Sequence, residues 1–270
     1  MYIYFPPANL INQGSGIIAS SNNYQFPVSL IYQSHLACDV WRSAVGNATE
    51  TLTIDLGGSW KAADYPNGLD ILVDSWNAND VCSAVSVTRT GPGGTTVLAL
   101  TGDSSTPQHY NIALDPTTGT TALVITFTKA LITTYMQVGK LFVGAPYDTG
   151  QQATPDMKGL SRTFMELANK DKSVLGQSFS EIRAVYDAFS LVLPVNPEAV
   201  ETVLRKKMFR ALGTSTPFWL RTVPGDPTTA ELDQPFYCKM TASAKEGMVG
   251  YGGSPAGYLW SLSLQVEKQL

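Results

Sequence analysis

The densest group of acidic side chains in the sequence is formed by Asp70, Asp74 and Asp80. Two carboxylates held a few ångströms apart can serve as acid and base in hydrolysis, and oxygen-rich loops bind calcium. The spacing is not that of an EF-hand loop. Asp70 and Asp74 flank an apolar tripeptide, as residues at the two ends of a strand do, and Asp80 follows asparagines in a turn-like stretch. We therefore expect strand-end and turn roles, with calcium binding as the weaker alternative.

Tryptophans in the first half of the chain are candidates for sugar binding, because aromatic faces stack on sugar rings. Trp41 precedes the first clear strand and is expected in the core, whereas Trp60 and Trp76 have polar neighbours. Aromatic residues in polar loops also mark protein interfaces, and this alternative stays open. The candidate carbohydrate site consists of Trp76, Asn77, Asn79 and Arg89.

Motifs for catalysis are missing from the sequence. It contains neither a Gly-x-Ser-x-Gly turn nor a phosphate loop followed by Lys and Ser or Thr. Its two histidines are His35 and His109, which excludes a multi-histidine metal site and a histidine-based triad in the second half. His109 follows Thr-Pro-Gln, for which we expect a loop and a solvated imidazole. The sequence thus predicts no enzyme, no catalytic residues and no cofactor.

Charge and hydropathy exclude further classes of protein. The net charge is −4, whereas a protein that binds duplex nucleic acid needs a basic face for the phosphates, so we expect no sequence-specific nucleic-acid partner. No apolar run approaches the ~18 to 20 residues that span a bilayer, and the N-terminus lacks a basic region followed by an apolar one. We therefore expect no membrane partner, and use without export. Three cysteines, Cys38, Cys82 and Cys238, leave at least one thiol free, and buried reduced thiols are expected.

The chain changes character near residue 150, which predicts two domains, 1–150 and 151–270. The first part carries 5 Lys and Arg against 10 Asp and Glu, and the second part carries 13 against 12. The stretch between them, 145–155, is rich in Pro, Gly and Gln, as linkers are.

The first part shows the period-two alternation of half-buried strands. Leu52, Ile54 and Leu56 alternate with polar residues, and the run 123–128 does the same. Turn clusters separate further short strands, and no long helical period intervenes. An antiparallel β-sandwich buries one face of each such strand.

A family resemblance is carried by five segments of this part. Together they are similar to the discoidin, or galactose-binding-like, jelly-roll sandwich, which covers about the first 145 residues. The resemblance implies a structural ion, which many members carry, and a domain that projects outward to hold neighbouring subunits, fibres or host glycans. The segments are Trp41-Arg42-Ser43, Leu52-Thr53-Ile54-Asp55-Leu56-Gly57, Ser86-Val87-Thr88-Arg89, Leu123 to Thr128 and Val138-Gly139-Lys140-Leu141-Phe142-Val143-Gly144.

The second part predicts strands and one helix. Asn196 can cap the helix, Pro197 suits its first turn, and Gly213 can end it, with an apolar stripe between them. The helix would pack on an antiparallel sheet, which gives an α+β domain. The expected strands are 183–193, 218–223, 236–241 and 258–267.

This strand-helix-strand order, with Pro217-Phe218-Trp219 entering the strand after the helix, is similar to the ring-forming domains of tailed-phage tail-tube and distal-tail proteins. The resemblance implies a structural role at the tail tip or baseplate of a virion, in a protein made in the host cytoplasm. Its partners would be copies of itself in a ring of six, neighbouring tube, hub and fibre proteins, and host glycans. The alternative is a carbohydrate-binding adhesin or accessory module, and a glycan-active enzyme is a distant third.

Overall fold

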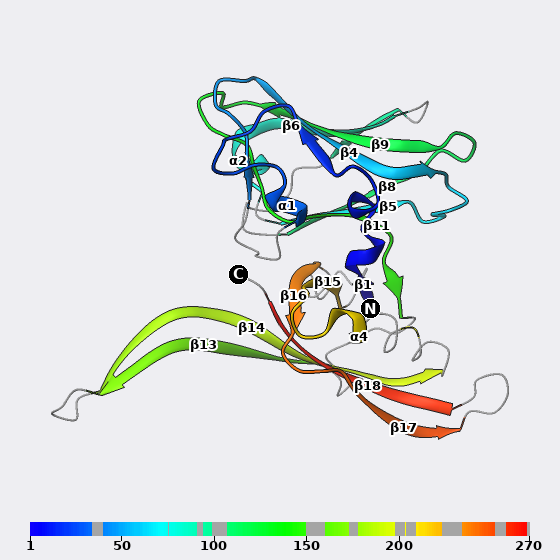
Figure 1. Ribbon diagram of the computed structural model, residues 1–270, viewed down its shortest axis with the longest axis vertical. Helices are drawn as coiled ribbons and strands as arrows, with labels where there is room; N and C mark the ends of the chain where they lie inside the picture. Colours follow the sequence, from blue (N-terminus) through cyan, green and yellow to red (C-terminus); the bar gives the residue numbers. More distant parts are fainter. Residues whose placement is uncertain are drawn as a thin grey trace. The chain divides into compact units, whose positions relative to one another are not determined.

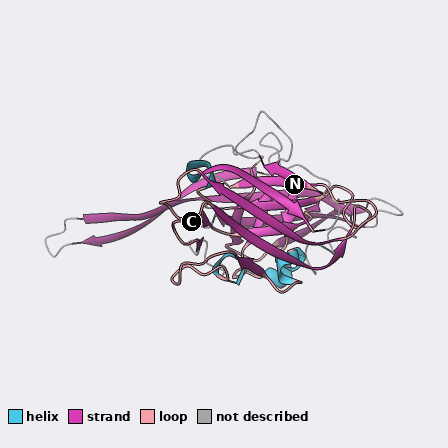
Figure 2. Cartoon of the chain, turned by 90° about the horizontal axis from the view of Figure 1, so that it is seen from above, coloured by secondary structure: helices cyan, strands magenta, loops and turns pink. Residues whose placement is uncertain are grey.

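The chain divides into two compact units. We call residues 2–148 and 219–236 the sandwich unit, and residue 1 with 149–218 and 237–270 the C-terminal unit. The predicted domains, 1–150 and 151–270, place residues 219–236 in the second domain, whereas the structure groups these residues with the first. Strand is the main secondary structure in both units (Figure 2). The computed structural model describes residues 1–33, 40–74, 76–90, 94–98, 107–149, 160–172, 178–197, 203, 209–222, 234–251 and 258–268.

Two antiparallel sheets build the main body of the sandwich unit (Figure 1). The larger has the order β2-β4-β9-β6-β7, with β2 (Ile17–Ala19), β4 (Thr49–Trp60), β9 (Thr120–Lys129), β6 (Cys82–Arg89) and β7 (Thr95–Leu98). The smaller has the order β11-β5-β8, with β11 (Leu141–Gly144), β5 (Leu69–Val73) and β8 (Gln108–Ile112). Short elements join them: η1 (Pro6–Ala8), η2 (Leu10–Asn12), α1 (Leu30–Gln33), β3 (Trp41–Arg42), α2 (Ala78–Val81) and β10 (Gln137–Val138).

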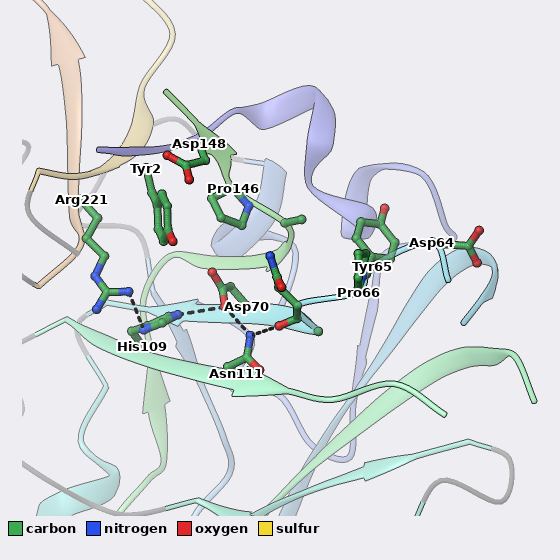
Figure 3. Close-up of a pocket in the computed structure, with 13 residues that line it drawn as sticks. Tyr2, Asp64, Tyr65, Pro66, Asp70, His109, Asn111, Pro146, Asp148 and Arg221 are labelled. Atoms are coloured by element: carbon green, nitrogen blue, oxygen red, sulfur yellow. Dashed lines mark hydrogen bonds and ion pairs between the residues drawn. The ribbon is translucent and has the colours of Figure 1, made fainter. Parts of the chain in front are cut away.

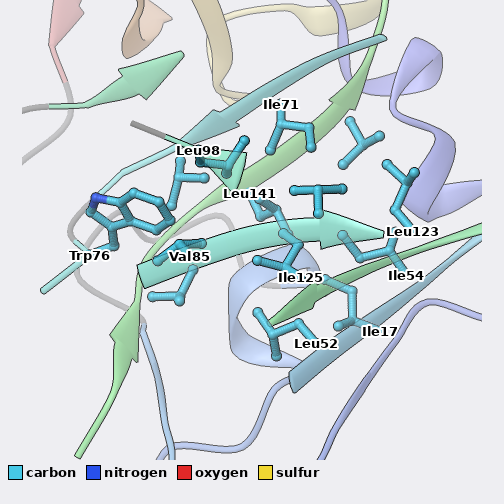
Figure 4. Close-up of a cluster of buried hydrophobic side chains, with 14 of the residues drawn as sticks. Ile17, Leu52, Ile54, Ile71, Trp76, Val85, Leu98, Leu123, Ile125 and Leu141 are labelled. Atoms are coloured by element: carbon cyan, nitrogen blue, oxygen red, sulfur yellow. The ribbon is translucent and has the colours of Figure 1, made fainter. Parts of the chain in front are cut away.

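The hydrophobic core lies between these two sheets, as Figure 4 shows. Leu52 and Ile54 of β4 point inward and are fully buried, while Thr51 and Thr53 are half-buried on the other face. Ile71 of β5 and Leu141 of β11 close the core from the smaller sheet. The mainly β architecture and the sandwich predicted from the alternation are confirmed.

The Asp-Leu-Gly segment at the end of the β4 apolar run forms a tight local structure. Asp55 accepts hydrogen bonds from the backbone N–H of Ser15, from that of Gly57 and from the Ser15 hydroxyl. These bonds, the Ser15 backbone bond first, lower the pKa of Asp55. Gly57 has φ +66°, and a Cβ there would lie 2.3 Å from the carbonyl oxygen of Gln13. Glycine is therefore required by both conformation and space.

β5 is buried on both faces, as is its neighbour β11. Leu69, Ile71 and Val73 face the core, so Asp70 and Leu72 point to the opposite side. A second layer of strands covers that side. Its order is β12-β1-β15, with β12 (Tyr147–Asp148), β1 (Tyr2–Tyr4) and β15 (Phe218–Arg221).

The C-terminal unit is built on β18, which pairs with β14, β16 and β17. β14 also pairs with β13, and its segment 178–187 has β13 as its partner, so the two strands run on as a two-stranded ribbon (Figure 1). Phe189 and Leu264 lie in the core of this unit. Its strands are β13 (Leu160–Lys172), β14 (Ser178–Pro197), β16 (Phe236–Met240), β17 (Lys245–Tyr251) and β18 (Tyr258–Lys268).

The predicted start of the helix at Asn196 and Pro197 is wrong. Both residues end β14, where they pair with Trp260 and Leu259 of β18, because a partner strand overrides the local capping preference. Within the predicted span, the structure describes α4 (Arg210–Leu212), which is followed by Gly213 at φ +56°. Residues 198–202 and 204–208 lie outside the described part of the chain.

Two of the three cysteines are described, and both are free and buried. Burial raises the pKa of Cys82 to about 11, although the charge of Lys129 acts in the opposite direction. Burial also raises the pKa of Cys238. Cys38 and His35 lie outside the described residues. Within the described residues, the helices are too short or too polar to span a lipid bilayer.

Candidate ligand-binding pocket

The structure places the predicted carbohydrate residues apart. Trp76 is 1% exposed and packs on Tyr110 and Phe127 in the core, so it has no free face for a sugar. Its predicted role is therefore corrected to core packing. Asn77, next to it, accepts a hydrogen bond from the Gln137 backbone.

Arg89 ends β6, whereas Trp76 and Asn77 precede it, and an eight-residue strand spans roughly 25 Å. The Arg89 side chain bonds the carbonyl oxygen of Ala113 instead. Asn79 lies in α2, and its side chain is outside the described part. The four predicted residues therefore do not share one surface.

The three predicted calcium ligands are also separated. Asp70 is in β5, Asp74 follows the end of that strand, and Asp80 is exposed in α2. Within the described residues, no three His, Cys, Asp or Glu side chains come close enough to hold a metal ion. Asp70 lines a cavity.

The register of β5 and β8 brings three polar side chains to the face turned away from the core. Asp70 pairs with Asn111, and Leu72 pairs with His109 two positions further along, on the same face. Directly opposite and diagonal residues of paired strands are close enough for long side chains to touch. The Asp70, His109 and Asn111 side chains therefore meet (Figure 3).

Asp70 is 6% exposed, and three side chains satisfy its carboxylate. The Asn111 amide donates to Oδ1 over 2.9 Å, the Tyr4 hydroxyl donates to Oδ2 over 2.9 Å, and His109 Nε2 lies 3.0 Å from Oδ1. Burial by itself raises the pKa of Asp70, but the bond and charge of His109 and the bonds of Asn111 and Tyr4 outweigh it. The pKa is lowered, and the carboxylate stays ionised at neutral pH.

His109 lies between a carboxylate and a guanidinium. Its Nδ1 is 3.4 Å from Nη1 of Arg221, on the other side of the ring from Asp70. The imidazole ring therefore links the carboxylate of Asp70 on one side to the guanidinium of Arg221 on the other. The predicted loop with a solvated imidazole is therefore wrong: His109 belongs to β8, and its side chain is 22% exposed.

Arg221 comes from the second layer, where the register aligns it with two further pocket residues. Tyr2 pairs with Arg221 of β15 on one side and with Asp148 of β12 on the other. Residues opposite one another in paired strands point to the same face. Tyr2, Asp148 and Arg221 therefore form one row, which lies across from Asp70 and His109 (Figure 3).

The space between the two layers is a cavity of about 530 Å³, which lies within the sandwich unit. The turn 64–68 forms its remaining wall and contributes Asp64 and the ring of Tyr65. Tyr65 packs edge-to-face on Trp60, with ring centroids 5.5 Å apart. A cavity of this size holds a small organic ligand.

The sequence contains one signal for this pocket that pattern reading missed. Leu72 lies on the same face of β5 as Asp70, and an apolar residue on that face indicates a second covering layer. The partners in that layer, Tyr2 and Arg221, are separated from β5 by long stretches of sequence, so periodicity alone could not identify them.

No family model matches the sequence, and no curated protein matches it. Solved structures with similar folds include chitosan-binding module 1 of a chitosanase/glucanase from Paenibacillus sp. IK-5, with 14% identity over 50% of this chain and 97% of that chain and a TM-score of 0.35. The family 32 carbohydrate-binding module of C. perfringens NanJ, solved with galactose, has 14% identity over 53% and 98% and a TM-score of 0.38. The same type of module from AlyQ, solved with 4,5-unsaturated mannuronic acid, has 18% identity over 48% and 94% and a TM-score of 0.33.

Proposed function

We propose that the sandwich unit is a glycan-binding module of the galactose-binding-like type and that its ligand occupies the pocket above Asp70. The observation that carries the proposal is a chain of side-chain contacts from Asp70 to His109, over 3.0 Å, and from His109 to Arg221, over 3.4 Å. These contacts lie inside a cavity that two tyrosines also line. Polar groups whose orientation is set before binding lose little entropy when a ligand arrives.

The chemistry of this lining suits a sugar. A hydroxyl group donates one hydrogen bond and accepts others, so neighbouring hydroxyls match carboxylate and guanidinium groups that present two atoms each. Asp64 and Asp148 can accept such bonds, and Arg221 can donate them. The rings of Tyr2 and Tyr65 supply apolar surface for the C–H face of a sugar ring.

The state of Asp70 favours binding over hydrolysis. Glycoside hydrolysis requires one carboxyl group with a raised pKa to act as acid. Asp70 has a lowered pKa and is saturated by Tyr4, Asn111 and His109, so it holds its neighbours in place and does not transfer protons.

The proposal is tested by isothermal titration calorimetry of the full chain against a panel of neutral, cationic and acidic oligosaccharides. We expect at least one to bind, and Arg221→Met to weaken that binding at least tenfold because a charged hydrogen bond is lost. Arg210→Met is the matched control, since Arg210 is exposed in the C-terminal unit. Thermal melting checks that both variants fold. Equal binding by the Arg221 variant, or no binding by the parent, contradicts the proposal.

A second candidate function, self-assembly, is favoured by β17. This strand pairs with β18, and its other edge has no partner among the described strands. Met248, Val249 and Tyr251 are 63, 56 and 68% exposed, although neighbouring residues of a strand point to opposite faces. An edge strand with apolar side chains on both faces is suited to adding a strand from another chain. Assembly into a tail ring, as the sequence suggested, would use this edge.

Self-assembly is tested by sedimentation velocity over a range of protein concentrations. We expect oligomers that Val249→Lys disrupts, because a lysine on an edge strand opposes further pairing. Val45→Lys is the control, since Val45 is 60% exposed and belongs to the other unit. A parent protein that stays monomeric at all concentrations rules out this candidate.

A further inference from the structure

We infer that the pocket selects glycans that carry protonated amines over their N-acetylated and acidic counterparts. The inference rests on the proposed glycan binding and deepens it. The charged groups of the lining are three carboxylates, Asp64, Asp70 and Asp148, and one guanidinium, Arg221. These four groups together give the lining a net charge of −2. Ion pairs between these groups do not change the net charge of the lining.

The negative charge is placed where a ligand can reach it. Asp70 is buried and saturated, and the charge of Arg221 on the far side of His109 offsets it. Asp64 and Asp148 are exposed, at opposite sides of the pocket (Figure 3). Oδ2 of Asp64 accepts the backbone N–H of Lys61 over 2.9 Å, and Oδ1 has no partner among the described residues.

Basic residues nearby do not reverse this balance. Lys61 is exposed, three positions before Asp64, and does not line the pocket. Lys140 is 3% exposed, and its ammonium group donates to the carbonyl oxygen of Leu30. A ligand in the cavity therefore meets more negative than positive charge.

The size of the effect follows from Coulomb's law. Two unit charges about 4 Å apart in water interact strongly enough to change affinity roughly fivefold, and more where water is partly excluded. An ammonium group near Asp64 or Asp148 should therefore bind roughly five- to tenfold more tightly than the same sugar with an acetamide. A uronic acid should bind more weakly than either one.

The experiment uses chitooligosaccharides and their fully N-acetylated forms, which share one backbone and differ in the charge on each sugar. Titration calorimetry of the full chain at about pH 6, where carboxylates are ionised, measures both affinities. We expect the free-amine form to bind roughly five- to tenfold more tightly, and the difference to shrink in high salt because mobile ions screen exposed charges. Asp64→Asn and Asp148→Asn should each reduce the difference, whereas Asp80→Asn, exposed in α2, should not.

The outcomes separate the inference from the proposed function. Binding of the N-acetylated or an acidic oligosaccharide as tightly as the free-amine form overturns the charge selection and leaves glycan binding intact. A preference that Asp80→Asn reduces as much as Asp64→Asn also overturns it, since the charge would then act from outside the pocket. If no neutral, cationic or acidic glycan binds, the proposed function itself fails.

Discussion

The hydroxyl of Tyr4 donates a hydrogen bond to Oδ2 of Asp70 over 2.9 Å, across a sequence separation of 66 residues. This bond joins β1 of the covering layer to β5 of the smaller sheet. It also holds the carboxylate that contacts His109 and Asn111. Burial, together with the charge and the bond of Asp70, raises the pKa of Tyr4, although Arg221 acts against this, so the hydroxyl stays a donor at all moderate pH values.

Removing this hydroxyl should destabilise the sandwich unit. Tyr4→Phe leaves Oδ2 of a buried carboxylate without a donor, which costs about 1 to 3 kcal/mol in the free energy of unfolding. Urea denaturation measures the change. Tyr24→Phe is the control and should be neutral, because Tyr24 is 87% exposed. A Tyr4 variant as stable as the parent would show that the bond contributes nothing to stability.

Stability should fall in acid partly because of Asp70. Its folded pKa is lowered from the ordinary 3.8, so its contribution is complete above about pH 3.8 and is lost as the pH falls towards the folded value. Asp70→Asn should therefore reduce the loss of unfolding free energy at low pH, as measured by urea denaturation across a pH series. Asp80→Asn should leave it unchanged. Part of the low-pH loss of stability should remain in the Asp70→Asn variant, because hydrogen bonds also lower the pKa of Asp55 and Asp115.

Two tryptophans predicted as surface aromatics should behave differently when truncated. Trp76→Ala should lower the free energy of unfolding by about 3 to 5 kcal/mol, because the residue is buried against Tyr110 and Phe127. Trp60→Ala should cost less, because Trp60 is partly exposed, but should weaken glycan binding by releasing Tyr65. Denaturation and calorimetry on both variants make the comparison. A stable Trp76 variant that loses binding would restore its predicted role in the site.

Two glycines with positive φ allow the cost of backbone strain to be separated from the cost of a steric clash with an added Cβ. Gly46→Ala, at φ +93° with nothing within 4 Å of the added Cβ, should cost about 1 kcal/mol. Gly57→Ala meets the same strain and also places a Cβ 2.3 Å from Gln13 oxygen, so it should cost about 1 to 3 kcal/mol more. The difference between their unfolding free energies measures the close contact. Equal costs would mean that the backbone at residues 13 and 57 moves apart freely.

Local patterns predicted much of the sandwich. The alternation at Leu52 and Ile54 gave the inward face of β4, and the apolar run before Asp74 gave β5. The helix start at Asn196 failed because the capping signal is local, whereas pairing with β18 is a long-range contact that outweighs it. The ring arrangement expected for the C-terminal unit stays a prediction.

The candidate site was predicted less well than the fold. Asp70 was considered for calcium, and Trp76 for sugar, because residue type and neighbours suggest chemistry without showing what faces what. Burial of Trp76 and the partners of Asp70 both depend on which strands pair.

The sequence by itself determined the strand-rich class, because side-chain alternation along a strand is a local property of the chain. It also showed that the motifs for catalysis considered above are missing, and it supplies the glycine that the backbone requires at position 57. Tertiary structure alone decided the pocket. Tyr2, Asp70, His109 and Arg221 are far apart in sequence and come together only when β1 pairs with β15 and covers the outer face of β5 and β8. Pairing register fixes which side chains meet, and that register is set by contacts between distant segments.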